Sequence, residues 1–345
     1  MVDAYYAVAL QLHCRSVNGV EGRGDAQKVI DGAIEHVRGA INGALRFHGM
    51  DTKLVVLPEY FLTGHPMGEG LDEWRDKACI AADGPEYEAL AKIAQEADIF
   101  LAGNAYETDT HFPELYFQTS FLIAPNGEQV LRYRRLISMY SPSPWDVWDK
   151  YLDIYGADAI FPVAEPEIGR VGAIASEEIL YPEIARLLAV RGAEVFLHSS
   201  SEVGSNELTI KNVAKRARAI ENLAYVVSAN SAGISGSMVL EASTEKGSQI
   251  VNYKGDVMVE AGYGESVIAF SEIDLAALRR YRRRPAMGNI LARQPMDLYA
   301  QYYGNQIVQP GNGLMKEGEV AMPERTYFLK RQSEVIDRLA KDGVI

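Results

Sequence analysis

The sequence predicts a single α/β domain of stacked sheet and helix layers, followed by a C-terminal extension. Segments with helical and with strand periodicity alternate from the N-terminus onward. Some neighbouring strands are joined by short turns, which favours a layered sandwich over a purely parallel sheet. Hydrophobic residues make up 48% of the 345 residues, so the chain can bury a large core. No Pro-, Ser- or Gly-rich linker divides it.

The first half of the chain alternates strand and helix patterns and contains one hairpin signal. A first strand is predicted in MVDAYYAVALQLHCRS, and apolar residues over 25–47 recur at helical spacing, which gives one buried face. The run KLVVLPE is typical of a buried strand and ends on Glu59. Beyond it, the pattern predicts a helix over 86–97, a strand over 99–107 and a hairpin over 116–135 with its turn at 125–127.

The second half begins with RVGAIASEEILYPEIARLLAVRGAEVFLHSS, which reads as a strand, a sharp turn, a helix and a strand. Its first strand ends on Ser176, and Gly192 has the position of a helix C-cap. After Pro285 the pattern becomes irregular, so we assign 1–284 to the domain and 285–345 to an extension on the dimer surface. Between these parts, the pattern predicts a helix over 207–222, a strand over 224–230 and a hairpin over 247–262.

Charge and cysteine usage exclude several classes of partner. The net charge of -13 disfavours nucleic acid and anionic membranes, which select basic surfaces. The only cysteines, Cys14 and Cys79, lack the spacing of a metal site and suit a reducing cytoplasm. The apolar run at the N-terminus is too short to span a bilayer, and acidic Asp3 replaces the basic start of a secretory signal. We therefore expect a cytoplasmic protein without metal.

Polar residues at the ends of predicted strands are the candidate functional residues, because such loops commonly carry function. Glu59 suits a general base in a closed pocket, or alternatively an ion pair that anchors a loop. Of Arg134 and Arg135, strand alternation places only one inward. Ser176 stands where a strand would deliver a nucleophile to the mouth of a turn. His198 follows a strand and is a candidate base near Ser176, or a structural histidine.

Five segments in order carry a family resemblance: LVVLPEYFLTG, GEQVLRYRRL, GAIASEEILYPEIARLLAVRGAEV, RAIENLAYVVSAN and GSQIVNYKGDVMVEAG. The chain resembles the nitrilase, or carbon-nitrogen hydrolase, superfamily from about residue 4 to about residue 275. The resemblance implies an αββα sandwich that pairs into αββα-αββα homodimers or higher homo-oligomers. It also implies a small amide, nitrile or carbamoyl substrate and no metal or organic cofactor.

The resemblance assigns roles to individual residues. Members of the superfamily attack with a cysteine, assisted by a glutamate base, a lysine that stabilises the oxyanion and a second glutamate. Glu59 falls on the base, Arg135 on the lysine, Ser176 on the cysteine and Ser143 near the second glutamate. Glu59, Arg135 and Ser176 are therefore the expected catalytic residues. The residues expected to contact the substrate are Tyr60, Ser143, Glu177 and His198.

Arg135, Ser176 and Ser143 differ from the residues that the superfamily has at these positions, and these differences leave two functions open. A serine hydroxyl depends on a well-matched base, whereas a thiol is partly ionised at neutral pH. A deliberate change of cysteine to serine would explain Ser176 alone, so natural divergence is the preferred explanation. One hypothesis is an atypical hydrolase or transferase that uses Ser176 or a water activated by Glu59. The other is a non-catalytic homologue that binds a small ligand or regulates a partner.

Overall fold

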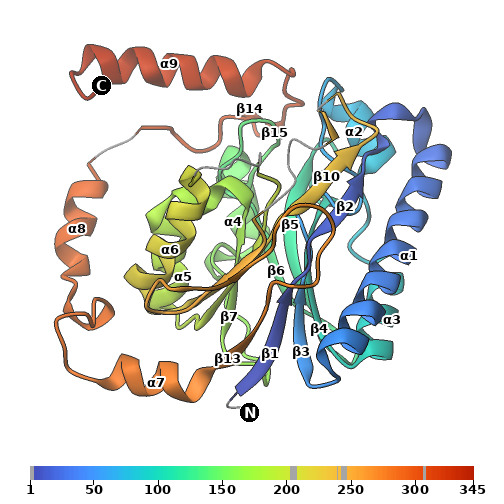
Figure 1. Cartoon of the computed structure of the whole chain (residues 1–345). Helices are drawn as coiled ribbons and strands as arrows, with labels where there is room; N and C mark the ends of the chain where they lie inside the picture. The colour runs from blue at the N-terminus through green and yellow to red at the C-terminus, as the bar shows by residue number, and fades with distance from the viewer. Residues whose placement is uncertain (1–3, 203–207, 239, 242–246, 306–307) are drawn as a thin grey trace.

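Two β-sheets pack face to face, and helices cover the outer face of each (Figure 1). The computed structural model describes residues 4–202, 208–238, 240–241, 247–305 and 308–345. The first sheet contains, in order, β13 (Phe270–Asp274), β1 (Ala4–Ala9), β3 (Thr52–Val56), β4 (Phe100–Thr108), β5 (Tyr116–Ile123) and β6 (Gln129–Arg134). The second contains β12 (Val257–Glu260), β11 (Gln249–Val251), β9 (Tyr225–Ala229), β8 (Val195–Ser199) and β7 (Val171–Ala175). The predicted α/β class is confirmed.

Side-chain alternation along the strands separates the core into layers. On β1, Ala7 and Ala9 face the second sheet, whereas Val8 between them packs under the helices of the first layer. On β8, Leu197 belongs to the layer between the sheets, while Phe196 packs against the helices of the opposite layer. Because both faces of these strands are buried, their sequences are mainly apolar. The strands therefore form the two middle layers of an αββα sandwich.

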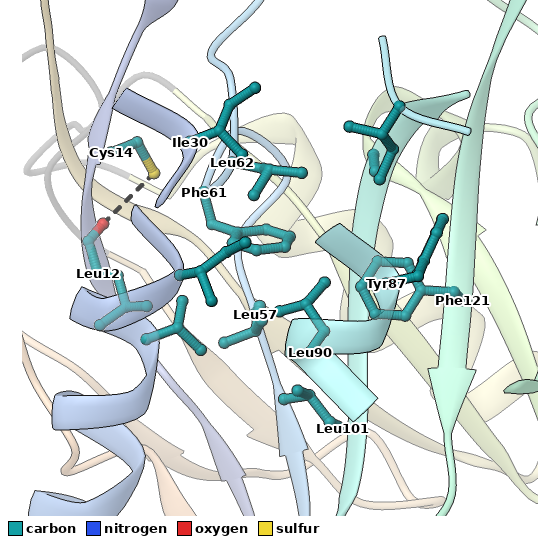
Figure 2. Close-up of a cluster of buried hydrophobic side chains, with 14 of the residues drawn as sticks. Leu12, Cys14, Ile30, Leu57, Phe61, Leu62, Tyr87, Leu90, Leu101 and Phe121 are labelled. Atoms are coloured by element: carbon teal, nitrogen blue, oxygen red, sulfur yellow. Dashed lines mark hydrogen bonds between the residues drawn. The ribbon is translucent and has the colours of Figure 1, made fainter. Parts of the chain in front are cut away.

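The helices α1 (Gly22–His48), α2 (Leu71–Ala78) and α3 (Pro85–Ala97) cover the first sheet. Ile30, Ile34 and Ile41 lie on the buried face of α1, as the helical spacing predicts. Each buried Ile or Leu stabilises the fold by roughly 1.5–3 kcal/mol, so this packing holds the helices in place more than intrinsic propensity does. Figure 2 shows the centre of this layer, where Leu57 and Phe61 meet side chains from α1, α3 and the sheet.

The helices α5 (Pro182–Val190) and α6 (Ile210–Asn222) cover the second sheet. Gly192 follows α5 with a φ of 108°, a conformation that suits glycine, so the predicted C-terminal signal is confirmed. Residue 207, where the second helix was expected to begin, lies outside the described residues. On α5, Ile184, Ala185 and Leu188 are buried in the core, while Leu187 points outward and is 40% exposed.

Among its described residues, the segment after Pro285 contains two α-helices, which the irregular sequence pattern did not predict. These are α8 (Met296–Tyr303) and α9 (Tyr327–Lys341), which line the periphery of the molecule in Figure 1. Few of their side chains are buried: none on α8 and only Phe328 on α9. The tail packs on its own domain through buried Leu314 and Phe328 and an Arg331–Asp146 ion pair of 2.6 Å.

Shorter elements complete the described chain. The strands β2 (Leu12–Arg15) and β10 (Ser231–Ser235) pair with each other, as do β14 (Met315–Lys316) and β15 (Glu319–Val320). None of the helices in the described ranges has the length and apolar character needed to cross a membrane. The remaining helices are α4 (Trp148–Tyr155) and α7 (Leu275–Arg283).

Candidate active site

The carboxyl ends of β3, β6, β7 and β8 deliver the candidate residues to one region between the two sheets. The backbone N–H of Glu59 donates to the carbonyl oxygen of Ser200 at 3.2 Å. Ser199 Oγ donates to the carbonyl oxygen of Leu57 at 2.8 Å. These two bonds tie the end of β3 in the first sheet to the end of β8 in the second. Polar loops from both sheets therefore meet at this point.

Glu59 and Arg135 form a buried pair that Gln118 holds in position. Arg135 Nη1 lies 3.4 Å from Glu59 Oε1, and both side chains are almost fully buried. Gln118, on β5, donates from Nε2 to Glu59 Oε1 at 2.8 Å and accepts at Oε1 from Arg135 Nη1 at 2.6 Å. Among the described residues, Glu59 Oε2 has no hydrogen-bond partner. The arrangement orients one carboxylate oxygen and leaves the other available to accept a proton.

Arg135 is fixed along its whole guanidinium group. Nε donates to the carbonyl oxygen of Ile137 at 2.7 Å, and Nη2 forms an ion pair with Glu177. Burial opposes the charge, yet the negative charges of Glu177 and Glu59 outweigh it and raise the pKa of Arg135. Arg134 is also buried, bound to Asp109, although alternation predicted that only one arginine points inward. The two side chains do alternate, because the N–H of Arg135 continues the pairing with β5 by donating to the carbonyl oxygen of Gln118 at 2.9 Å. Arg134 lies on the opposite face, where the rings of Phe117 and Tyr151 cover it, so it is buried as well.

Ser176 occupies a strained turn directly after β7. Its φ of 49° places a non-glycine residue in the left-handed region, which typically costs about 1–3 kcal/mol and is found most often at functional sites. The side chain is only 4% exposed. Lys211 Nζ, on the first turn of α6, donates to Ser176 Oγ at 3.3 Å. Among the described residues no hydrogen bond joins Ser176 Oγ to Glu59 or Arg135.

Glu178 locks the Ser176 turn against the loop that carries Arg135. Its Oε1 accepts from the backbone N–H groups of Leu136 at 2.7 Å and Ile137 at 3.1 Å. Its Oε2 accepts from the Tyr133 hydroxyl at 2.8 Å and from the N–H of Ala175 at 3.2 Å. Burial raises the pKa of this carboxyl group, while the surrounding donors and Arg135 oppose that shift. Glu178 is thus the structural link between β6 and β7.

Comparison with known proteins identifies the family. A family model described as carbon-nitrogen hydrolase matches residues 24–283. The chain belongs to the carbon-nitrogen hydrolase family. A formamidase of Bacillus cereus is 26% identical over 257 residues, which cover 74% of this chain and 70% of the formamidase. A formamidase of Bacillus anthracis matches with the same identity and coverage.

Solved structures at low sequence identity share the fold. A carbon-nitrogen hydrolase from Helicobacter pylori superposes with a TM-score of 0.65 at 22% identity, covering 87% of this chain and 98% of that one. Nit3 of Saccharomyces cerevisiae, from the nitrilase superfamily, superposes with a TM-score of 0.64 at 20% identity, covering 82% and 94%. An amidase from Nesterenkonia sp., with an acetamide moiety on its active-site cysteine, gives 0.62 at 17% identity, covering 86% and 96%.

Both ring nitrogens of His198 are engaged in the protein interior. Nε2 lies 2.9 Å from the carbonyl oxygen of Ser176, which can only accept, so Nε2 carries the hydrogen. Nδ1 then accepts from the Ser228 hydroxyl at 2.8 Å. Burial, and next the charge of Lys215, hold the pKa of His198 well below its usual value. This geometry contradicts the hypothesis that His198 is the base for Ser176 and leaves no ring nitrogen for a substrate.

We expect His198 to make the stability of the domain dependent on pH. The folded protein keeps His198 neutral, whereas the unfolded chain protonates it below about pH 6.5, so acid favours unfolding. The free energy of unfolding should therefore fall by up to about 1.4 kcal/mol per pH unit below that point from this group. Urea denaturation should show that the free energy of unfolding falls less between pH 7 and pH 5 in His198→Gln than in the native protein. An undiminished loss would contradict the assignment, and exposed His111→Gln is the control.

Ser143 and Tyr60 have different surroundings. Ser143 Oγ donates to Asp146 at 2.8 Å and caps a 3-10 turn over Pro144–Val147, while Asp146 also binds Arg331 of the tail. Ser143 therefore caps this turn, and among the described residues no hydrogen bond joins it to Glu59. Tyr60 follows Glu59 in the chain, and burial, then the charge of Glu59, raises the pKa of its hydroxyl.

Neither cysteine can stand in for a nucleophile at this site. Cys14 is buried in β2, where its thiol donates to the carbonyl oxygen of Leu12 at 3.6 Å (Figure 2). Cys79 is buried after α2. Burial raises the pKa of both thiols, so neither is activated as a thiolate.

The structure adds three residues that sequence reasoning missed. Gln118 begins a polar run, Gln118–Ser120, within the buried strand β5, and this run was the available signal. Lys211 lies on a helix, where nothing in the local pattern marks it as functional. Glu178 follows Ser176 and Glu177, so its position beside the candidate turn was the available signal. Their importance depends on contacts between segments that are distant in sequence.

Proposed function

We propose that this chain hydrolyses the carbon-nitrogen bond of a small amide, with Ser176 in place of the family's cysteine nucleophile. The observation that carries the proposal is the buried Glu59–Arg135 pair, oriented by Gln118 beside the strained Ser176 turn. Such a buried, charge-balanced carboxylate at converging strand ends suits a general base. The names of the formamidases and the amidase among the relatives support an amide as the substrate class.

In the proposed reaction, Ser176 Oγ attacks the amide carbonyl carbon while its proton passes to Glu59. The resulting tetrahedral intermediate carries a negative oxygen. Its carbon-nitrogen bond then breaks as Glu59 returns the proton to the nitrogen, and ammonia or an amine leaves. Water attacks the ester, gives one proton to Glu59, and releases the acid when that proton returns to Ser176 Oγ. Each cycle consumes one water and restores both side chains.

Arg135 supplies the positive charge near this reaction. Its nitrogens are already engaged by Glu59, Gln118, Ile137 and Glu177, so it acts mainly through its charge and by orienting Glu59. A buried cation close to the reacting carbonyl favours a transition state in which negative charge develops. The broad, fixed guanidinium fork also makes the pocket different from one built around a lysine.

The test is a substrate panel of amides, nitriles, carbamoyl compounds and esters with the native protein and Glu59→Gln. We expect amide turnover that falls by roughly 10²–10⁴-fold in Glu59→Gln, the range for loss of a general acid-base group. Exposed Glu73→Gln on α2 is the matched control and should retain activity. Absence of turnover with every compound would overturn the proposed function.

A non-catalytic homologue is the second candidate. The observation that favours it is the missing hydrogen bond between Ser176 Oγ and Glu59 among the described residues. Under this alternative, the same buried charged groups hold a small acid or amide without breaking it. Calorimetric binding of an amide with no product formation would support this candidate.

We also propose that the protein is a homodimer paired through α5 and α6. Four side chains of α5 cannot line this interface, because they are buried in the protein's own core: Ile184, Ala185, Leu188 and Ala189. The outer face instead carries exposed apolar side chains from both helices, which close approach of a second copy would cover. These side chains are Leu187, Val190, Val213 and Ile220.

If the protein pairs through the outer face of α5 and α6, a charged residue introduced on that face should weaken the dimer. Val213 is 49% exposed, so Val213→Glu should leave the domain folded while the buried charge weakens association. Light scattering at micromolar concentration should give a dimer for the native protein and a monomer for the variant. Met50→Glu, at a residue that is 67% exposed, should remain dimeric. A native monomer at this concentration would contradict the proposal.

A further inference from the structure

Within the described ranges, Lys211 forms the one side-chain hydrogen bond to the Ser176 hydroxyl. Its Nζ lies 3.3 Å from Ser176 Oγ and 3.3 Å from Ser200 Oγ. Lys211 lies on the first turn of α6 and is half-buried. Its amine therefore reaches the site from the helices that cover the second sheet. Glu59 and Arg135 reach the same region from the first sheet. The site therefore has a second cation that no family role covers.

We propose that Lys211 is a catalytic residue whose ammonium group stabilises Ser176 Oγ as that oxygen gains negative charge. This inference rests on the proposed function, since it concerns the nucleophile of the same reaction. An ammonium group can only donate hydrogen bonds. While Lys211 donates to Oγ, the hydroxyl hydrogen is directed elsewhere and is free to leave toward Glu59. Lys211 keeps its own protons throughout.

The chemistry of serine explains why such a cation is needed. A cysteine thiol is already a few per cent ionised at neutral pH, but a serine hydroxyl is not. A positive charge in contact with the oxygen lowers the energy of the alkoxide and strengthens the hydrogen bond as charge develops. A serine at this position therefore requires more electrostatic support than a cysteine would.

Other nearby groups are committed elsewhere. His198 contacts the carbonyl oxygen of Ser176 and not its hydroxyl. Lys215 is fully buried and donates to Asn212 Oδ1 at 3.0 Å and the carbonyl oxygen of Gly247 at 3.3 Å. Arg135 is held by carboxylates on two sides. Lys211 thus has both the contact and the charge for the role.

The experiment measures the reactivity of Ser176 without relying on a substrate. A fluorophosphonate is added to the purified protein, and intact mass follows the adduct in which Oγ bonds to phosphorus and fluoride leaves. We expect labelling of the native protein, none with Ser176→Ala, and labelling slowed by about 10²-fold in Lys211→Met. Lys211→Arg should retain part of the rate because it keeps the charge. Exposed Lys92→Met, on α3, should match the native rate.

A second arm separates catalytic support from a structural role. In the Ser176→Cys background, alkylation by iodoacetamide is measured with and without Lys211→Met. Because the thiol ionises more readily, removing Lys211 should slow alkylation by less than about 10-fold. Equal slowing of the serine and cysteine proteins, or loss of helical circular dichroism in Lys211→Met, would mean that Lys211 only supports the fold and would overturn the inference.

The two proposals fail in different ways. Lys211-dependent labelling of Ser176 in a protein that hydrolyses no amide would support Lys211 and overturn the proposed substrate. Amide turnover that survives Ser176→Ala, in a protein that fluorophosphonate does not label, would keep the hydrolase but move the attack to water, and would overturn the inference. Labelling at Ser176 with an unchanged rate in Lys211→Met would overturn the inference alone.

Discussion

Replacing Ser176 by alanine is expected to lower kcat/KM for the amide substrate by at least about 10³-fold, because removal of a nucleophile eliminates the covalent route. The residual rate would come from binding and from water activated by Glu59. The measurement is steady-state turnover on the best amide of the panel. Circular dichroism should show that Ser176→Ala remains folded. Ser333→Ala, at an exposed serine on α9, is the matched control.

Ser176→Cys makes this prediction sharper. The thiol is the better nucleophile in isolation, yet we do not expect it to create an efficient nitrilase, because Arg135 and Ser143 remain. The guanidinium of Arg135 is locked between Glu59 and Glu177, so the pocket stays shaped for it. Full native turnover in Ser176→Ala would contradict the serine mechanism. High nitrilase activity from Ser176→Cys alone would contradict the view that these residues act as a set.

Replacing Glu178 by alanine is expected to lower the free energy of unfolding by about 3–5 kcal/mol, because it leaves buried donors unpaired. The carboxylate accepts hydrogen bonds from the backbone of Leu136, Ile137 and Ala175 and from the Tyr133 hydroxyl. Glu178→Gln keeps one acceptor oxygen, so its free energy of unfolding should fall less than that of Glu178→Ala. Urea denaturation measures the difference.

The control for Glu178 is Glu88→Ala, which removes an exposed carboxylate on α3 and should change stability by less than about 0.5 kcal/mol. We also expect Glu178→Ala to lower activity in the protein that remains folded, since the turn of Ser176 loses its link to the Arg135 loop. Similar stability of Glu178→Ala and Glu88→Ala would contradict the anchoring role.

Local sequence pattern predicted the helices and hairpins whose apolar residues are buried in the core. The helical spacing over 25–47 predicted α1, and the turns near 125–127 and 254–255 predicted the hairpins of β5–β6 and β11–β12. The helices α8 and α9 after Pro285 were not predicted, and they bury few side chains.

Local pattern predicts the α/β class, the order of most strands and helices, and candidate positions at strand ends: Glu59, the pair Arg134 and Arg135, and Ser176. Which of these groups contact one another depends on tertiary packing. Gln118 and Lys211 come from a strand and a helix far from Glu59 and Ser176 in the sequence, and His198 contacts a carbonyl oxygen instead of a hydroxyl. Periodicity reports whether a side chain points inward, whereas a hydrogen bond depends on angstrom-scale placement by the packing of both sheets.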